Sequence, residues 1–135
     1  MARRKLRYLA EAADELVVLC EGGAEGFGDV PERVRAAERL IQVVVQVVID
    51  LSNLILVEMG SPPATTGRLA VQQACSNLGA GRGLARRLDG LVKVRNRLVH
   101  LYDRVSTREV YAGARSAGVA QREFGRLATA FLRDR

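Results

Sequence analysis

The stretch LIQVVVQVVIDLSNLILV, from Leu40 to Val57, decides the fold class. Its apolar residues recur at helical rather than alternating spacing, and no break interrupts the pattern before Gly60. Upstream, Asp29 offers an N-cap, and Pro31 lies close to the first helical position. We therefore predict one long helix at about residues 31–59, roughly 43 Å in length at a rise of about 1.5 Å per residue.

The same stretch is close to the minimum length of a membrane span, but its polar residues favour a different environment. At about 100° per residue they fall within a sector of about 120° on the helical wheel. A polar stripe is unfavourable in a helix that is surrounded by lipid, whereas a helix that is buried on most sides can line a groove or an interface with it. We therefore expect a core helix and no membrane association. This polar stripe consists of Arg35, Glu38, Gln42, Gln46, Asp50 and Asn53.

The rest of the chain also has helical spacing of its Val, Leu and Ala residues. Apolar stripes predict helices at about residues 3–21, 66–78 and 84–102. Turn signals are few and lie between these segments. They are EGGAEGFGD, GSPPATT and GAGRG.

A final helix is predicted after the last of these segments. Ser106, with Glu109 three residues later, forms a capping box that indicates a helix start. Gly113 and Gly118 weaken this helix in its middle, where we expect a kink or a break. The prediction is an all-α protein of about five helices, folded as a single domain of residues 1–135.

Composition limits the classes of partner and cofactor. The net charge of +6 and the pI near 10.1 favour an anionic partner, while 4% aromatic residues and no Trp argue against a base-stacking platform. Cys20 and Cys75 fit no metal or redox spacing, so we expect no metal site and no cofactor. Acidic residues soon follow the basic N-terminus, unlike in a signal peptide, so we expect a cytoplasmic location with reduced thiols.

The segment VRNRLVHLYD, residues 94–103, holds the only histidine of the chain. On a helical wheel Arg95 interrupts the apolar stripe, whereas His100 lies on the polar side with Asn96 one turn before it. Each residue has an ordinary explanation as well. Arg95 could pair with a buried carboxylate such as Asp50, and His100 could interact with the helix dipole.

Together, these residues suggest phosphate chemistry. RNA can be cleaved without a metal when its 2′-hydroxyl attacks the adjacent phosphate, and His100 and Arg95 could supply proton transfer and charge stabilisation. One chain has one histidine, so the chemistry favours a homodimer that brings two into one groove. On an ideal helix the two side chains point about 140° apart. For both side chains to reach one phosphate, the helix must be irregular, the long arginine must wrap around it, or the groove must lie between two subunits.

The segment RNRLVHLY, Arg95 to Tyr102, resembles the R-N-x-x-x-H-x-Y motif of the HepT-like branch of HEPN-domain proteins. Residues 35–60 are similar to the long helix of that family, and VSTREVY resembles its following turn and helix. Residues 31–133 follow the family pattern, whereas the first 30 match only loosely. The resemblance implies a HEPN-type helical bundle that acts as a homodimeric, metal-independent endoribonuclease, usually the toxin of a bacterial toxin–antitoxin pair.

By position, the resemblance implies that Arg95 and His100 are the catalytic pair and that Asn96 orients the site. It also implies a minimal nucleotidyltransferase antitoxin, which neutralises the toxin by adding AMP to Tyr102. Such a group would place bulk and negative charge at the mouth of the groove and repel RNA. Asp50 and Asn53 are candidates for lining that groove, although many relatives have His where this chain has Asn53.

Two alternatives belong to other functional classes. A catalytically inactive HEPN domain could bind its nucleotidyltransferase partner or a nucleotide through the same groove. Replacement of His100 separates the two cases, because an enzyme loses activity and a binding domain still binds. The charge alone suggests a DNA-binding helical regulator, but the basic residues are scattered rather than gathered on one recognition helix.

Overall fold

A computed structural model describes residues 2–100 and 104–133 of the chain. Within these residues the protein consists of six helices and no strand, so the all-α prediction is confirmed. The helices are α1 (Ala2–Leu19), α2 (Gly23–Phe27), α3 (Pro31–Glu58), α4 (Gly67–Leu78), α5 (Arg82–Val99) and α6 (Thr107–Arg133).

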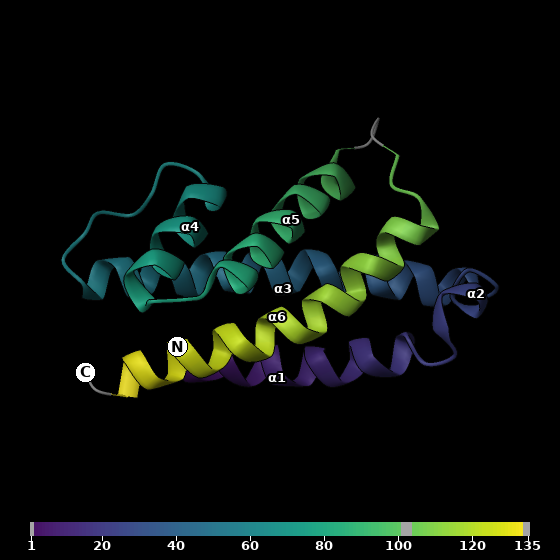
Figure 1. The fold of residues 1–135 in the computed structure, drawn as a ribbon, viewed down its shortest axis with the longest axis horizontal. Helices are drawn as coiled ribbons and strands as arrows, with labels where there is room; N and C mark the ends of the chain where they lie inside the picture. Colours follow the sequence, from purple (N-terminus) through teal and green to yellow (C-terminus); the bar gives the residue numbers. More distant parts are fainter. Residues whose placement is uncertain (1, 101–103, 134–135) are drawn as a thin grey trace.

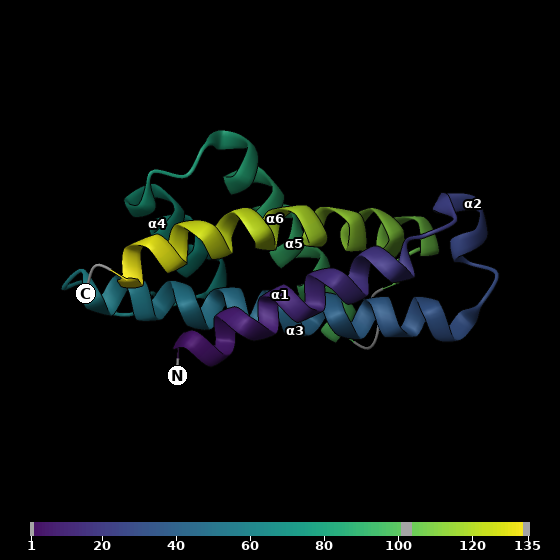
Figure 2. The ribbon, with the colours of Figure 1, turned by 90° about the horizontal axis from the view of Figure 1, so that it is seen from below.

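The long helix α3 is the element against which α1, α4, α5 and α6 all pack. Figures 1 and 2 show it running along the molecule, with α1 and α6 beside it and α4 and α5 against another side. It has 28 residues, so it ends one residue before the predicted range 31–59, and Pro31 is its first residue. The N-cap is Val30, without a side-chain hydrogen bond, so the prediction of Asp29 as the cap is wrong. Pro31 sets the start because its ring fixes φ and it has no N–H to leave unsatisfied.

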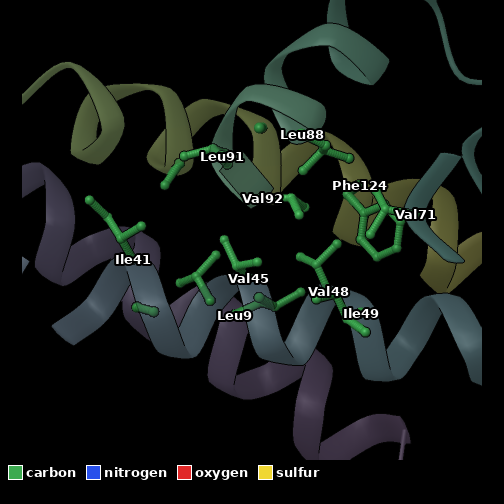
Figure 3. Close-up of a cluster of buried hydrophobic side chains, with 14 of the residues drawn as sticks. Leu9, Ile41, Val45, Val48, Ile49, Val71, Leu88, Leu91, Val92 and Phe124 are labelled. Carbon is green, nitrogen blue, oxygen red and sulfur yellow. The ribbon is translucent and has the colours of Figure 1, made fainter. Parts of the chain in front are cut away.

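One hydrophobic cluster joins the five long helices. Leu9 of α1, Leu88 and Val92 of α5 and Phe124 of α6 all join the valines of α3 in this cluster, and Figure 3 shows Phe124 near Leu88 and Val71. Each such side chain contributes about 1.5–3 kcal/mol when it is fully buried. Burial on several sides explains why α3 is so apolar.

By length and composition alone, α3 could also cross a membrane. Its most apolar 18-residue window has a mean hydropathy of 2.2, and 56% of that window is buried by the rest of the protein. The polar stripe accounts for part of the unburied remainder, because none of its six residues is buried. This arrangement is typical of a core helix in a helical bundle.

The short helix α2 was not predicted, so the structure has one helix more than the five expected. It lies in the segment EGGAEGFGD, whose glycines indicated only a turn. Phe27 stabilises it, because its ring is fully buried and packs edge-on against Tyr111 with 5.2 Å between the ring centroids. A five-residue helix is too short to show a periodic pattern.

The start of α6 is the predicted capping box. The Glu109 N–H donates to Ser106 Oγ, and the Ser106 N–H donates to Glu109 Oε1, both over 3.1 Å. Beyond this point α6 is one continuous helix of 27 residues, so the prediction of a kink or break at Gly113 and Gly118 is wrong. Gly113 has a packing role instead. A Cβ atom there would lie 3.3 Å from Ile41 Cδ1, so the glycine allows α6 to approach α3 closely.

Two alanine substitutions in α6 test this role. Gly118→Ala should raise the free energy of unfolding by up to about 1 kcal/mol, because alanine favours helix and its methyl group meets nothing within 4 Å. Gly113→Ala should stabilise less, because the side chain of Ile41 has to move. Urea unfolding of both variants measures the difference. An equal or larger gain from Gly113→Ala would contradict the packing role.

Candidate active site

Helix α5 carries the first part of the predicted motif and ends earlier than expected. His100 is its C-cap, with φ −89° and ψ 116°, so the backbone there is extended rather than helical. The N–H of His100 still donates to the carbonyl oxygen of Arg97 over 3.2 Å. The predicted helix to residue 102 is therefore too long, because the chain leaves the helix at His100.

This early end changes the expected relation between Arg95 and His100. A separation of about 140° applies only if both residues lie on one ideal helix. Arg95 lies within α5, whereas His100 begins the connection to α6. The helix ends before His100, so the separation on one ideal helix does not apply to this pair.

The described members of the catalytic prediction differ in exposure. Asn96 and His100 are exposed, and Arg95 is half-buried. The proposed modification position, Tyr102, lies outside the described residues. Because His100 is exposed, a polymer that lies across the surface can reach it, and no closed pocket is needed.

The guanidinium group of Arg95 is held by two amide side chains. Its Nη1 donates to Asn96 Oδ1 over 2.9 Å, and its Nη2 donates to Oε1 of Gln46, on α3. The ordinary explanation, a direct ion pair with Asp50, is therefore not what the structure shows. Arg95 reaches Asp50 only through Gln46.

Asp50 is the centre of a longer chain of contacts. Its Oδ1 accepts a hydrogen bond from Gln46 Nε2 over 2.9 Å, and its Oδ2 lies 3.2 Å from Lys5 Nζ, on α1. The result is a continuous polar connection from Asn96 through Arg95, Gln46 and Asp50 to Lys5, which we call the Arg95 relay. It joins three helices.

Sequence reasoning identified part of this relay. Gln46 was placed on the polar stripe but was not proposed as a site residue, although it lies one turn before Asp50. Lys5 was missed, because it is 45 residues from Asp50 in the chain and no local pattern links them. Asp50, proposed to line the groove, is connected to Arg95 by the side chain of Gln46.

The second groove candidate, Asn53, has a different environment. Its Oδ1 accepts a hydrogen bond from the backbone N–H of Ala64 over 3.2 Å. This bond holds the loop that follows α3. Within the described residues, no hydrogen bond connects Asn53 with the Arg95 relay.

A second arginine of the motif, Arg97, anchors the connection from α5 to α6. Its guanidinium group pairs with the Glu109 carboxylate and donates to the carbonyl oxygen of Arg104. The bond from Arg97, together with those from Ser106, holds the pKa of Glu109 below its usual range. Arg97 therefore joins the end of α5 to Arg104 and to the first turn of α6, a role that the motif alone did not reveal.

One groove of the described residues lies away from this motif. It has a volume of about 590 Å³, lies between α1 and α6, and is lined by neither Arg95 nor His100. Within residues 2–100 and 104–133, no three His, Cys, Asp or Glu side chains are placed to hold a metal ion together. The described polar groups at the end of α5 include the imidazole of His100, the guanidinium group of Arg95 and the amide of Asn96.

Comparison with protein families identifies the family of the chain. A family model described as "Ribonuclease HepT-like" matches residues 9–124. The chain belongs to the HepT-like ribonuclease family. This is a family of toxins in the HEPN superfamily, so the resemblance of the motif is confirmed. No curated protein matches the chain.

The match places the site within the shared part of this HepT-like ribonuclease. Residues 9–124 include all of α3 and α5 and the segment from Arg95 to Tyr102. The match begins at residue 9, whereas the family pattern was recognised in the sequence only from residue 31. Lys5 lies outside it, so the N-terminal end of the Arg95 relay is outside the matched region.

The Arg97–Glu109 pair predicts a pH-dependent stability. Since the folded-state pKa of Glu109 is lowered, its stabilising effect is complete above the ordinary carboxyl pKa and is lost as the pH falls through the folded-state value. The parent should therefore be more stable than Glu109→Gln at neutral pH, and the gap should close in acid. Added salt should reduce the stability difference between the parent and Glu109→Gln, because the side chains of Arg97 and Glu109 are 41% and 42% exposed and their ion pair is screened.

Urea unfolding over a series of acidic pH values measures this gap. Glu123→Gln is a matched control, since Glu123 lies on the same helix and makes no ion pair or hydrogen bond among the described residues. It should show no comparable closing gap. A difference between parent and Glu109→Gln that stays constant into acid would contradict the assignment.

Proposed function

We propose that the protein is a metal-independent endoribonuclease that acts as the toxin of a bacterial toxin–antitoxin pair in the cytoplasm. The observation that carries the proposal is the end of α5 in a member of a ribonuclease family. There, a held arginine is followed by an exposed histidine that has left the helix. These are the two side chains that metal-free phosphate chemistry needs.

The proposed reaction is an internal transfer at phosphorus. The 2′-oxygen of the RNA forms a bond to the adjacent phosphorus while the bond from phosphorus to the 5′-oxygen breaks. A base takes the proton of the 2′-hydroxyl, and an acid gives a proton to the departing 5′-oxygen. His100 is suited to proton transfer near neutral pH, and Arg95 stabilises the additional negative charge on the phosphorane. Asn96 orients Arg95 through its amide oxygen.

A homodimer would complete the site. Each chain has one histidine, whereas the reaction needs a base and an acid. A two-fold axis beside the end of α5 would place two histidines and two arginines in one groove.

Neutralisation would act through Tyr102, two residues after His100. We propose that a minimal nucleotidyltransferase antitoxin transfers AMP from ATP to the Tyr102 hydroxyl, with release of pyrophosphate. The added phosphate would repel RNA from the arginines of the groove.

Cleavage of RNA by the purified protein in EDTA tests the enzymatic proposal. His100→Ala and Arg95→Ala should each reduce cleavage by at least about a hundred-fold, because each removes a group that acts in the transition state. Arg82→Ala is a matched control. It removes the same charge from the other end of α5 and should retain activity within about two-fold.

The outcomes separate the functional classes. Cleavage by His100→Ala at the parental rate would show that the site is assigned wrongly. No cleavage by a parent of unmodified mass would favour the inactive domain that binds its nucleotidyltransferase partner or a nucleotide. Intact mass must therefore be recorded for each preparation, because an AMP group would also silence the enzyme.

Modification is tested by incubating the protein with ATP and a minimal nucleotidyltransferase of the proposed antitoxin class. The parent should gain the mass of one or more AMP groups and lose RNA cleavage. Tyr102→Phe should keep its mass, since it lacks the acceptor hydroxyl, and should still cleave RNA. An equal mass gain in Tyr102→Phe would place the modification at another residue.

A further inference from the structure

The Arg95 relay suggests a role for a residue outside the motif. Gln46 projects from α3 and connects Arg95 with Asp50. It is exposed, so it contributes little to the core. The same stripe carries Gln42 one turn earlier, and Gln42 makes no side-chain hydrogen bond among the described residues. The contacts of Gln46 therefore follow from its position opposite Arg95 and not from its type alone.

The orientation of the Gln46 amide follows from Asp50. An ionised carboxylate only accepts hydrogen bonds, so it must face the NH₂ end of the amide. The oxygen end then faces Arg95, whose guanidinium group only donates. The reverse orientation would place an acceptor against a carboxylate and a donor against a guanidinium group. Asp50 thus fixes which end of Gln46 meets Arg95.

Lys5 completes this arrangement from α1. Its ammonium group lies 3.2 Å from Asp50 Oδ2, while Gln46 uses Oδ1. The positive charge of Lys5 balances the negative charge of Asp50. Asp50 can therefore orient Gln46 without presenting an uncompensated negative charge near the position where RNA phosphate would lie.

A neutral partner also preserves the charge of Arg95. Arg68 of the same protein provides the contrast, because two of its nitrogens bind the Asp89 carboxylate over 2.7 and 3.2 Å. Such a fork uses the face of the guanidinium group that would bind a phosphate, and the carboxylate cancels its charge. Both described partners of Arg95 are amide oxygens, which hold the group in place and leave it cationic.

We propose that Gln46 is a positioning residue for Arg95, with its amide oriented by Asp50 and Lys5. The inference rests on the proposed ribonuclease activity and extends it to three residues outside the motif. Gln46 does not touch the reacting atoms. It holds the guanidinium group toward the groove and keeps its positive charge for the phosphorane.

Steady-state cleavage of one RNA substrate by four variants tests this role. Gln46→Ala should lower kcat roughly ten- to a hundred-fold with a smaller change in KM, because a misplaced arginine weakens transition-state stabilisation. Gln46→Glu should raise KM as well, since a carboxylate would pair with Arg95 and repel RNA. Asp50→Asn should have a smaller effect in the direction of Gln46→Ala. Gln42→Ala is the matched control and should stay within about two-fold of the parent.

Urea unfolding of the same variants separates positioning from a structural role. Gln46→Ala should unfold at nearly the parental urea concentration, because Gln46 is exposed. A loss of activity that is matched by a loss of stability, or that Gln42→Ala shows equally, would overturn the proposal.

Arg95→Ala distinguishes the two levels of inference. An inactive parent of unmodified mass, or an active Arg95→Ala, would overturn the proposed function and this role with it. An active parent, an inactive Arg95→Ala and a fully active Gln46→Ala would overturn the role of Gln46 alone. The expected pattern is an active parent and Gln42→Ala, a weakened Gln46→Ala and an inactive Arg95→Ala.

Discussion

The burial of α3 is the constraint on which the rest of the structure depends. An apolar helix of 28 residues has to be covered on most sides, and α1, α4, α5 and α6 together provide that cover. The polar stripe is the side that remains. Because α1 and α5 pack against α3, Lys5 and Arg95 can reach the stripe at Asp50 and Gln46. The same packing that buries the core therefore assembles the relay.

The site combines a rigid part with a part that leaves regular structure. Arg95 is fixed between two helices, whereas His100 follows the end of α5 and belongs to the connection with α6. Arg97, near the end of α5, pairs with Glu109 in the first turn of α6. This division suits the two roles in the proposed reaction: the cation is positioned in advance, and the histidine is exposed.

Much of the fold could be predicted from the sequence, because its signals are local. The apolar period gave the position of α3, and the Ser106–Glu109 pair marked the start of α6. The motif gave the family. The relay could not be predicted in full, since the contact between Lys5 and Asp50 exists only when two distant helices pack. The predicted kink at Gly113 was wrong for the same reason. The low helix propensity of glycine is a local property, whereas the space that Gly113 leaves for Ile41 depends on the packing of two helices.

The central claim is that the RNA supplies its own nucleophile and that no metal takes part. It is tested most directly by the ends of the products that form in EDTA, with a strand that carries one 2′-deoxy nucleotide at the cleavage position. Internal transfer predicts 2′,3′-cyclic phosphate and 5′-hydroxyl ends, and no cleavage at the deoxy nucleotide. Products with 3′-hydroxyl and 5′-phosphate ends, or cleavage of the deoxy strand at an equal rate, would contradict it.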